Sequence, residues 1–128
     1  MMFKNWISVG AVAGAKAIVL GAFGAHAFKN FLEANQKIAI YQTAVEYHFY
    51  HALALIGVGI LQKIFPEQNR SIHQAGQLFL WGIILFSGSL YVFSVTSYRW
   101  IGFITPFGGI MLIAAWLFLG WSFRKLVL

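Results

Sequence analysis

Four long apolar runs, separated by short polar stretches, make up most of the chain. They cover residues 6–28, 38–61, 75–98 and 104–123. A helix needs roughly 20 predominantly apolar residues to cross the hydrocarbon core of a bilayer, and each run meets that length. Lipid admits only helices and closed barrels, and these runs lack the apolar–polar alternation of barrel strands. We therefore predict four transmembrane helices.

The stretches between the runs carry the signals of turns and interfacial segments. Polar and apolar residues alternate over residues 28–33, which predicts a short amphipathic segment in the membrane interface after the first span. The most polar stretch, residues 64–70, separates the second and third spans. Thr105 and Pro106 predict an N-cap followed by a proline in the first turn of the last helix. Because short connections join antiparallel neighbours, we predict an all-α integral membrane protein, an antiparallel four-transmembrane-helix bundle forming a single domain over residues 1–128.

The composition agrees with a membrane protein and excludes several kinds of chemistry. The chain is 60% hydrophobic and 9% charged, with a mean hydropathy of +0.75, whereas soluble domains carry about a quarter charged residues. It has no cysteine, which excludes disulfides, thiolate catalysis and cysteine-ligated metal clusters. The net charge is +6, but the basic residues stand singly near the ends of the apolar runs. We expect them to contact membrane lipid headgroups, and we expect no nucleic-acid partner.

The positions of the basic residues also predict an orientation. Five Lys and Arg residues lie in the N-terminal tail, the second connection and the C-terminal tail, against three in the first and third connections. By the positive-inside rule, both termini are expected in the cytoplasm. Lys4 and the segment 25–27 imitate a secretory signal, but Lys16 interrupts its apolar core, so we expect a retained first helix.

Ionisable and hydroxyl side chains within the apolar runs are the candidates for function. Ionisable groups at the bilayer centre cost about 2.5 to 3.5 kcal/mol on insertion scales, so they usually face the interior of a bundle. In an up-down-up-down bundle, most of the polar residues of the four runs fall in the same half of the membrane. We therefore predict a polar pocket or hydrogen-bond network there, formed by His26, Glu46, Tyr47, His51, Ser87, Ser89, Tyr91 and Thr105.

Two interpretations of this cluster stay open. Polar side chains in membrane helices often only hydrogen-bond across helices, at about 0.6 to 2 kcal/mol for each bond. This structural interpretation is favoured for Ser87, Ser89 and Thr105. Glu46 is different, because a carboxylate at depth must pair, bind a proton or contact water. For Glu46, a role in binding a ligand, proton or metal is as well supported as a structural one.

Metal binding rests on the histidines. His48 and His51 are three residues apart and can share a helix face, and Glu46 or His26 could complete a ligand set. No established metal motif accompanies them. A haem held by His26 and His51 has no specific support, so we expect no cofactor. His73 lies in the predicted second connection, where we expect it to be solvated.

Lys16 is unusual because it lies deep in the first span. It is about 15 Å from either end of the predicted helix, too deep for its amine to reach the interface easily. It either pairs with Glu46, if the first two helices are neighbours, or is a neutral or water-contacting lysine. The sequence leaves both interpretations open.

Small residues form a stripe along the first span, at Gly10, Gly14 and Gly21. Such stripes let helices approach closely, within a bundle or between copies of a chain. We expect the stripe to serve packing, with a homo-oligomer as one outcome.

Several ordered motifs resemble a known membrane family. They are GAFGAHA at 21–27, TAVEY at 43–47 with HALAL at 51–55, FSGSLY at 86–91 and ITPFGG at 104–109. Together they resemble the family called domain of unknown function 423, which is related to transmembrane protein 256, over essentially the whole chain. The resemblance implies a four-helix integral membrane protein, of the inner membrane in bacteria, and implies no activity. Lys16 departs from the apolar residue expected at its position. The residues that match the motifs are His26, Tyr47, His51, Ser87, Ser89, Tyr91, Thr105 and Pro106.

Two hypotheses about function follow from the residues. We expect no enzymatic activity, because the chain has no evident nucleophile–base pair, no second carboxylate within a span and no phosphate-binding loop. The first hypothesis is a small carrier or channel-like protein that binds or transports an ion or small amphiphile through the polar pocket, with Glu46 as its coupling group. The second is a non-enzymatic scaffold or accessory subunit that binds lipid or a partner protein. In that case the polar cluster only holds the helices together.

Overall fold

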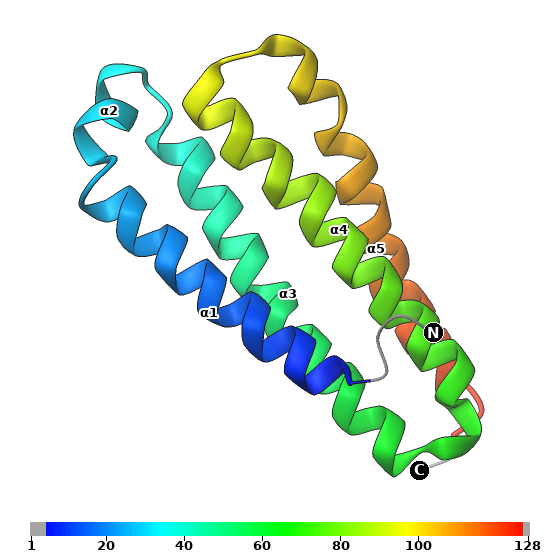
Figure 1. Cartoon of the computed structure of the whole chain (residues 1–128). Helices are drawn as coiled ribbons and strands as arrows, with labels where there is room; N and C mark the ends of the chain where they lie inside the picture. The colour runs from blue at the N-terminus through cyan, green and yellow to red at the C-terminus, as the bar shows by residue number, and fades with distance from the viewer. Residues whose placement is uncertain (1–4, 127–128) are drawn as a thin grey trace.

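The computed structural model describes residues 5–126, which fold into long helices joined by short helical segments (Figure 1). Each apolar run becomes a helix because its backbone groups then bond to one another and not to lipid. With the 3₁₀ segments that precede α4 and α5, all four long helices are long and apolar enough to cross a membrane, which confirms the predicted fold class. The elements, in chain order, are α1 (Trp6–Ala25), α2 (Lys29–Ala34), α3 (Ile38–Ile64), the 3₁₀ segment η1 (Pro66–Gln68), α4 (Asn69–Thr96), the 3₁₀ segment η2 (Arg99–Phe103) and α5 (Thr105–Ser122).

Helices that follow one another in the chain pack as antiparallel neighbours. The main contacts join α1 to α3, α3 to α4 and α4 to α5. Figure 1 shows α2 and the turn between α4 and α5 at one end of the bundle, with the start of α1 and the end of α5 at the other. The predicted polar positions of the four helices therefore lie in the half of the bundle that ends at α2 and η2.

Several predicted boundaries differ from the structure, among them the end of the second span, which extends to Ile64 and not only to Leu61. The first span ends at Ala25, with His26 in the C-cap position, and the amphipathic segment after it forms the separate helix α2. The third span begins at Asn69, six residues before its predicted start, because residues 69–74, most of which are polar, form the first turns of α4. An apolar pattern cannot detect helical turns that lie beyond the hydrocarbon.

The start of the last helix also differs in part. Thr105 is the first residue of α5 and does not serve as its N-cap, since Ile104 occupies that position without a side-chain cap. Pro106 does lie in the first turn, as predicted, where its missing N–H costs no hydrogen bond.

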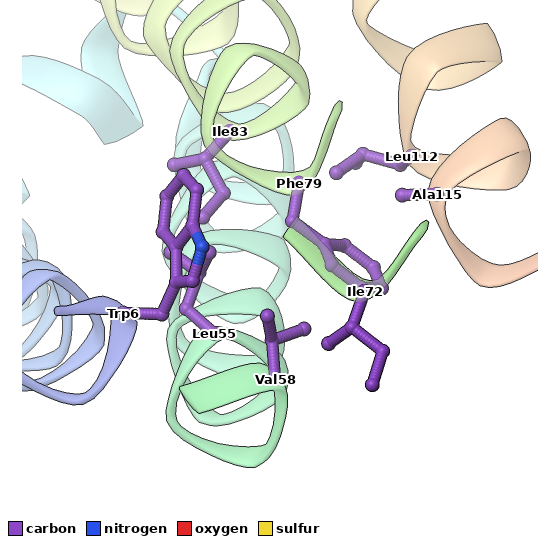
Figure 2. Packing of buried hydrophobic residues seen from close by; sticks show 8 residues of the cluster. All are labelled: Trp6, Leu55, Val58, Ile72, Phe79, Ile83, Leu112 and Ala115. Atoms are coloured by element: carbon purple, nitrogen blue, oxygen red, sulfur yellow. The ribbon is translucent and has the colours of Figure 1, made fainter. Parts of the chain in front are cut away.

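A buried apolar cluster in the other half of the bundle holds the long helices together (Figure 2). Trp6 is fully buried, and its indole Nε1 donates to Nδ1 of His73 at 3.0 Å. The expectation that His73 is solvated in a loop was wrong: the early start of α4 brings its ring against α1. The cluster consists of Trp6, Leu55, Val58, Ile72, Phe79, Ile83, Leu112 and Ala115.

Glycine permits the close crossing of α1 and α3. A Cβ at Gly10 would lie 2.7 Å from the carbonyl oxygen of Ala52 and 2.8 Å from the backbone nitrogen of Ile56. On the facing helix, a Cβ at Gly59 would lie 2.7 Å from the backbone nitrogen of Ile7. Larger residues at either position would push the two backbones apart.

The predicted glycine stripe of α1 faces α3 of the same chain. Gly10 touches the α3 backbone, Gly14 lies near Ala52, and a Cβ at Gly21 would lie 3.2 Å from the side chain of Val45. The stripe therefore serves packing within the bundle. A homo-oligomer through Gly10, Gly14 and Gly21 stays a prediction, since a single chain does not test it.

Candidate functional site

His48 and Tyr91 form a pair between α3 and α4. The distance from His48 Nδ1 to the Tyr91 hydroxyl is 3.0 Å, and the two rings meet edge to face. Tyr41 packs against the Tyr91 ring with a centroid distance of 5.3 Å, and its hydroxyl donates to the carbonyl oxygen of Leu20 on α1. These contacts tie α1, α3 and α4 together.

His51 is buried, and both of its ring nitrogens are engaged. Its Nδ1 lies 2.6 Å from the carbonyl oxygen of Tyr47, and the indole Nε1 of Trp116 on α5 donates to Nε2 at 3.1 Å. Since a carbonyl oxygen only accepts and an indole N–H only donates, Nδ1 carries the proton and the ring is neutral. His51 therefore links α3 to α5 and has no nitrogen lone pair left for a metal.

Ser89 and Thr105 join α4 to the start of α5. Their hydroxyl oxygens are 2.6 Å apart, and Ser89 donates to the carbonyl oxygen of Phe86 at 2.9 Å. Because the single hydroxyl proton of Ser89 is used there, Thr105 is the donor between them. This bond explains why Thr105 is turned toward α4 instead of capping its own helix.

Three of the candidates, His26, Glu46 and Tyr47, face outward. His26 is exposed beyond the end of α1, and Glu46 is exposed on α3, where it lines a cavity of about 340 Å³ between α1 and α3. Tyr47 is 40% exposed. The expectation of one pocket that gathers all eight residues was therefore wrong: α3 and α4 distribute them over several faces. That each of them binds a ligand stays a prediction.

The proposed metal ligands do not converge either. Within residues 5–126, no group of three or more His, Asp or Glu side chains lies close enough to hold a metal ion. His26 lies beyond the end of α1, and on α3 His51 is engaged with Trp116 of α5. His48 bonds to Tyr91, whereas Glu46 is on the outer side of α3.

Lys16 and Glu46 do not pair. Lys16 lines a cavity between α1 and α4, and Glu46 lines the smaller one between α1 and α3. In the part of the chain that the structure describes, neither side chain forms an ion pair. Of the two interpretations of Lys16, pairing with Glu46 is the one that the structure contradicts.

Glu46→Gln should leave the stability of the folded monomer unchanged. The carboxylate is exposed and makes no hydrogen bond or ion pair within residues 5–126, so the amide removes no contact. Thermal unfolding in detergent would give equal midpoints for the two proteins. A lower midpoint for the variant would mean that Glu46 has a partner, such as another copy of the chain.

The larger cavity between α1 and α4 is about 650 Å³ and has mostly apolar walls. Its polar lining residues are Ser8 and Lys16 of α1, His48 of α3, and Ser87 and Tyr91 of α4. Ser87 is 1% exposed, and its hydroxyl makes no hydrogen bond with any described residue. The apolar side chains of the walls are Val9, Val12, Leu20, Leu80, Ile83 and Ile84.

Sequence reasoning missed Lys16 and His48 as neighbours of Ser87 and Tyr91. The sequence does give the angular position of Lys16 on its helix. Lys16 lies about 200° around α1 from Gly14, so it could not share the face that packs on α3. Val9, Val12 and Leu20 share the face of Lys16 by their spacing. The sequence did not reveal that α4 forms the opposite wall of a cavity at this face.

The four apolar helices and their interhelical bonds define a small multi-pass membrane protein of the helix-bundle class. No solved structure matches the chain. The chain belongs to the family described as "Protein of unknown function (DUF423)", which matches over residues 20–109.

Bacterial membrane proteins are similar to the chain over most of their length. The UPF0382 membrane protein YwdK of Bacillus subtilis is 41% identical over 114 residues, covering 89% of this chain and 91% of the relative. The UPF0382 membrane protein SSP2132 of Staphylococcus saprophyticus is 39% identical over 116 residues, covering 91% and 93%. The UPF0382 inner membrane protein YgdD of Escherichia coli is 34% identical over 108 residues, covering 83% and 79%. These relatives confirm the family that the motifs indicated and a location in a membrane, which for the E. coli protein is the inner membrane.

Proposed function

We propose that this protein binds a small amphiphile from the membrane in the cavity between α1 and α4. The observation that carries the proposal is the cavity itself, whose volume of about 650 Å³ lies within the range of small-molecule sites. Its apolar walls suit a hydrocarbon chain, and its few polar groups can orient one end of that chain. Val12 and Ile84 on its walls are 55% and 47% exposed, so the cavity opens toward the lipid.

An amphiphile suits this site better than an ion. Ion binding needs several converging ligands, and no such group of His, Asp or Glu exists among the described residues. Glu46 lines a different cavity, so it gains no support as the coupling group of a transport path. We propose a binding role without a catalytic step and without a bound cofactor.

A structural role is the second proposal, for the other polar residues only. His51 bonds across helices to Trp116, and Ser89 bonds to Thr105. Because these side chains bond to one another across helices, they form no binding site between them. The scaffold hypothesis therefore applies to this network, whereas the α1/α4 cavity supports binding.

We further propose that both termini lie in the cytoplasm. The start of α1 and the end of α5 lie at the same end of the bundle (Figure 1). The excess of Lys and Arg belongs to that end.

Filling the cavity should prevent binding. Gly88 lines the cavity, and a Cβ there would meet no atom within 4 Å, so Gly88→Phe adds a ring without a clash at its base. In proteoliposomes, a photoreactive long-chain alcohol should label α1 and α4 at the cavity of the wild type. We expect the variant to reduce this labelling about tenfold, a loss of about 1.4 kcal/mol of binding free energy.

Gly120→Phe is the matched control, since Gly120 on α5 also has open space and lies outside this cavity. It should leave the labelling of α1 and α4 unchanged. Wild-type labelling spread evenly over exposed lipid-facing residues, such as Ile110 and Ile113 of α5, would contradict the proposal.

A further inference from the structure

We infer that the α1/α4 cavity selects a long-chain fatty acid, whose carboxylate Lys16 and Ser87 bind. This inference rests on the proposed function and adds the chemistry of the ligand. It depends on two polar groups that the fold leaves without partners and on the depth at which they lie.

Lys16 favours an anion as its partner. It lines the cavity near the middle of α1, about 15 Å along the helix from its ends, and forms no ion pair within residues 5–126. A cation at this depth is unfavourable unless it pairs or reaches water. Its ammonium group has three donors and no acceptor, so only an acceptor, and best a charged one, can satisfy it.

The unpaired hydroxyl of Ser87 also favours a ligand with a hydrogen-bond acceptor. Serines in membrane helices commonly donate to the carbonyl four residues earlier, as Ser94 does to Leu90 at 2.7 Å and Ser122 does to Phe118 at 2.8 Å. Ser87 makes no such bond, although it is only 1% exposed and lines the cavity. A buried hydroxyl without a partner is unfavourable, so its proton is available for a bound acceptor.

Tyr91 and His48 do not compete for this anion. The Tyr91 hydroxyl is engaged with Nδ1 of His48. The cavity therefore offers the donors of Lys16 and Ser87 without a carboxylate of its own, and a ligand carboxylate has lone pairs for both. Its hydrocarbon chain would lie along the apolar walls.

A fatty acid fits this depth better than a phospholipid. The headgroup of a phospholipid is large and strongly hydrated and stays near the interface, whereas Lys16 lies near the middle of its helix. A single chain also suits a cavity of about 650 Å³, the size of a site for one drug-sized ligand.

The test compares a photoreactive stearic acid with its methyl ester, which has the same chain and no charge. Labelling is mapped in proteoliposomes of the full chain. In the wild type, the acid should label the cavity about tenfold more efficiently than the ester, as expected for a charge-assisted hydrogen bond. Lys16→Met should remove this preference while keeping the labelling by the ester, and Lys16→Arg should retain it. Ser87→Ala should reduce labelling by the acid more than labelling by the ester, because a hydrogen bond to a charged acceptor is the stronger one.

The outcomes separate this inference from the proposed function. Equal labelling of the wild-type cavity by acid and ester would overturn the recognition of a carboxylate and leave the proposed binding of an amphiphile intact. Labelling of the cavity by neither probe nor by the long-chain alcohol would overturn both. An unchanged preference in Lys16→Met would overturn the role of Lys16. Displacement of the acid by added phosphatidylglycerol but not by unlabelled stearic acid would show that the bound anion is a phospholipid headgroup. It would overturn the inference that the ligand is a fatty acid.

Discussion

Gly108→Ala should separate α5 from α4 and destabilise the protein by about 3 kcal/mol. A Cβ at Gly108 would lie 2.2 Å from the backbone nitrogen of Phe86 and 2.7 Å from the carbonyl carbon of Leu85. These are main-chain atoms of α4, so no rotamer change can relieve the overlap and the whole helix must shift. Unfolding in detergent, followed by circular dichroism against temperature or denaturant, would measure the loss.

Gly120→Ala provides the control on the same helix. A Cβ there would meet nothing within 4 Å, so the methyl group causes no overlap. Alanine favours a helix over glycine by about 1 kcal/mol or less, so this variant should be neutral or slightly more stable. Equal destabilisation by the two variants would contradict the prediction, because it would mean that the close approach of α4 and α5 at Gly108 does not decide the effect.

The four helices could be predicted because membrane-spanning segments have a length and composition that few other structures share. Their packing partners followed from the short connections. The boundaries were less predictable: Asn69 begins α4 among polar residues that carry no apolar signal, and Thr105 has the chemistry of an N-cap yet bonds to Ser89. In both cases a tertiary contact or an extension into the interface overrides the local pattern.

For the candidate site, the sequence predicted the depth of each residue in the membrane but not the neighbours that its side chain contacts. Sequence position fixes the level of a residue in the membrane, but each step along a helix turns the side chain by 100°. Ser87 and Ser89 are at similar depth, yet one lines the α1/α4 cavity and the other bonds to α5. Which face meets which neighbour depends on the rotation of every helix, and that rotation follows from packing such as the contact of Gly10 with α3.

The partner of His51 was unpredictable for a related reason. Trp116 lies in the apolar face of a span, where tryptophan usually indicates packing or an interface. Its indole N–H is nevertheless the donor that occupies His51. A search limited to ionisable and hydroxyl residues overlooks such a donor, and so made His51 a candidate ligand.

His51→Leu should therefore act on stability, with a free-energy loss of about 2 kcal/mol. Leucine has a similar volume, but it leaves the indole N–H of Trp116 without its acceptor in a site where His51 is only 6% exposed. Trp116→Phe removes the donor instead. In the double variant the orphaned group is absent, so the two losses should not add.

A double-mutant cycle in detergent would measure this coupling. We expect about 0.6 to 1.7 kcal/mol between His51 and Trp116, the range found for hydrogen bonds between membrane helices. Losses that add without coupling would contradict the two hydrogen bonds assigned to the neutral His51 ring. Its ring nitrogens would then again be candidates for binding a ligand. A positive coupling, combined with wild-type labelling of the α1/α4 cavity in both variants, would separate the two roles. The polar network would then fix the helices, and the cavity that opens toward Lys16 and Ser87 would bind the ligand.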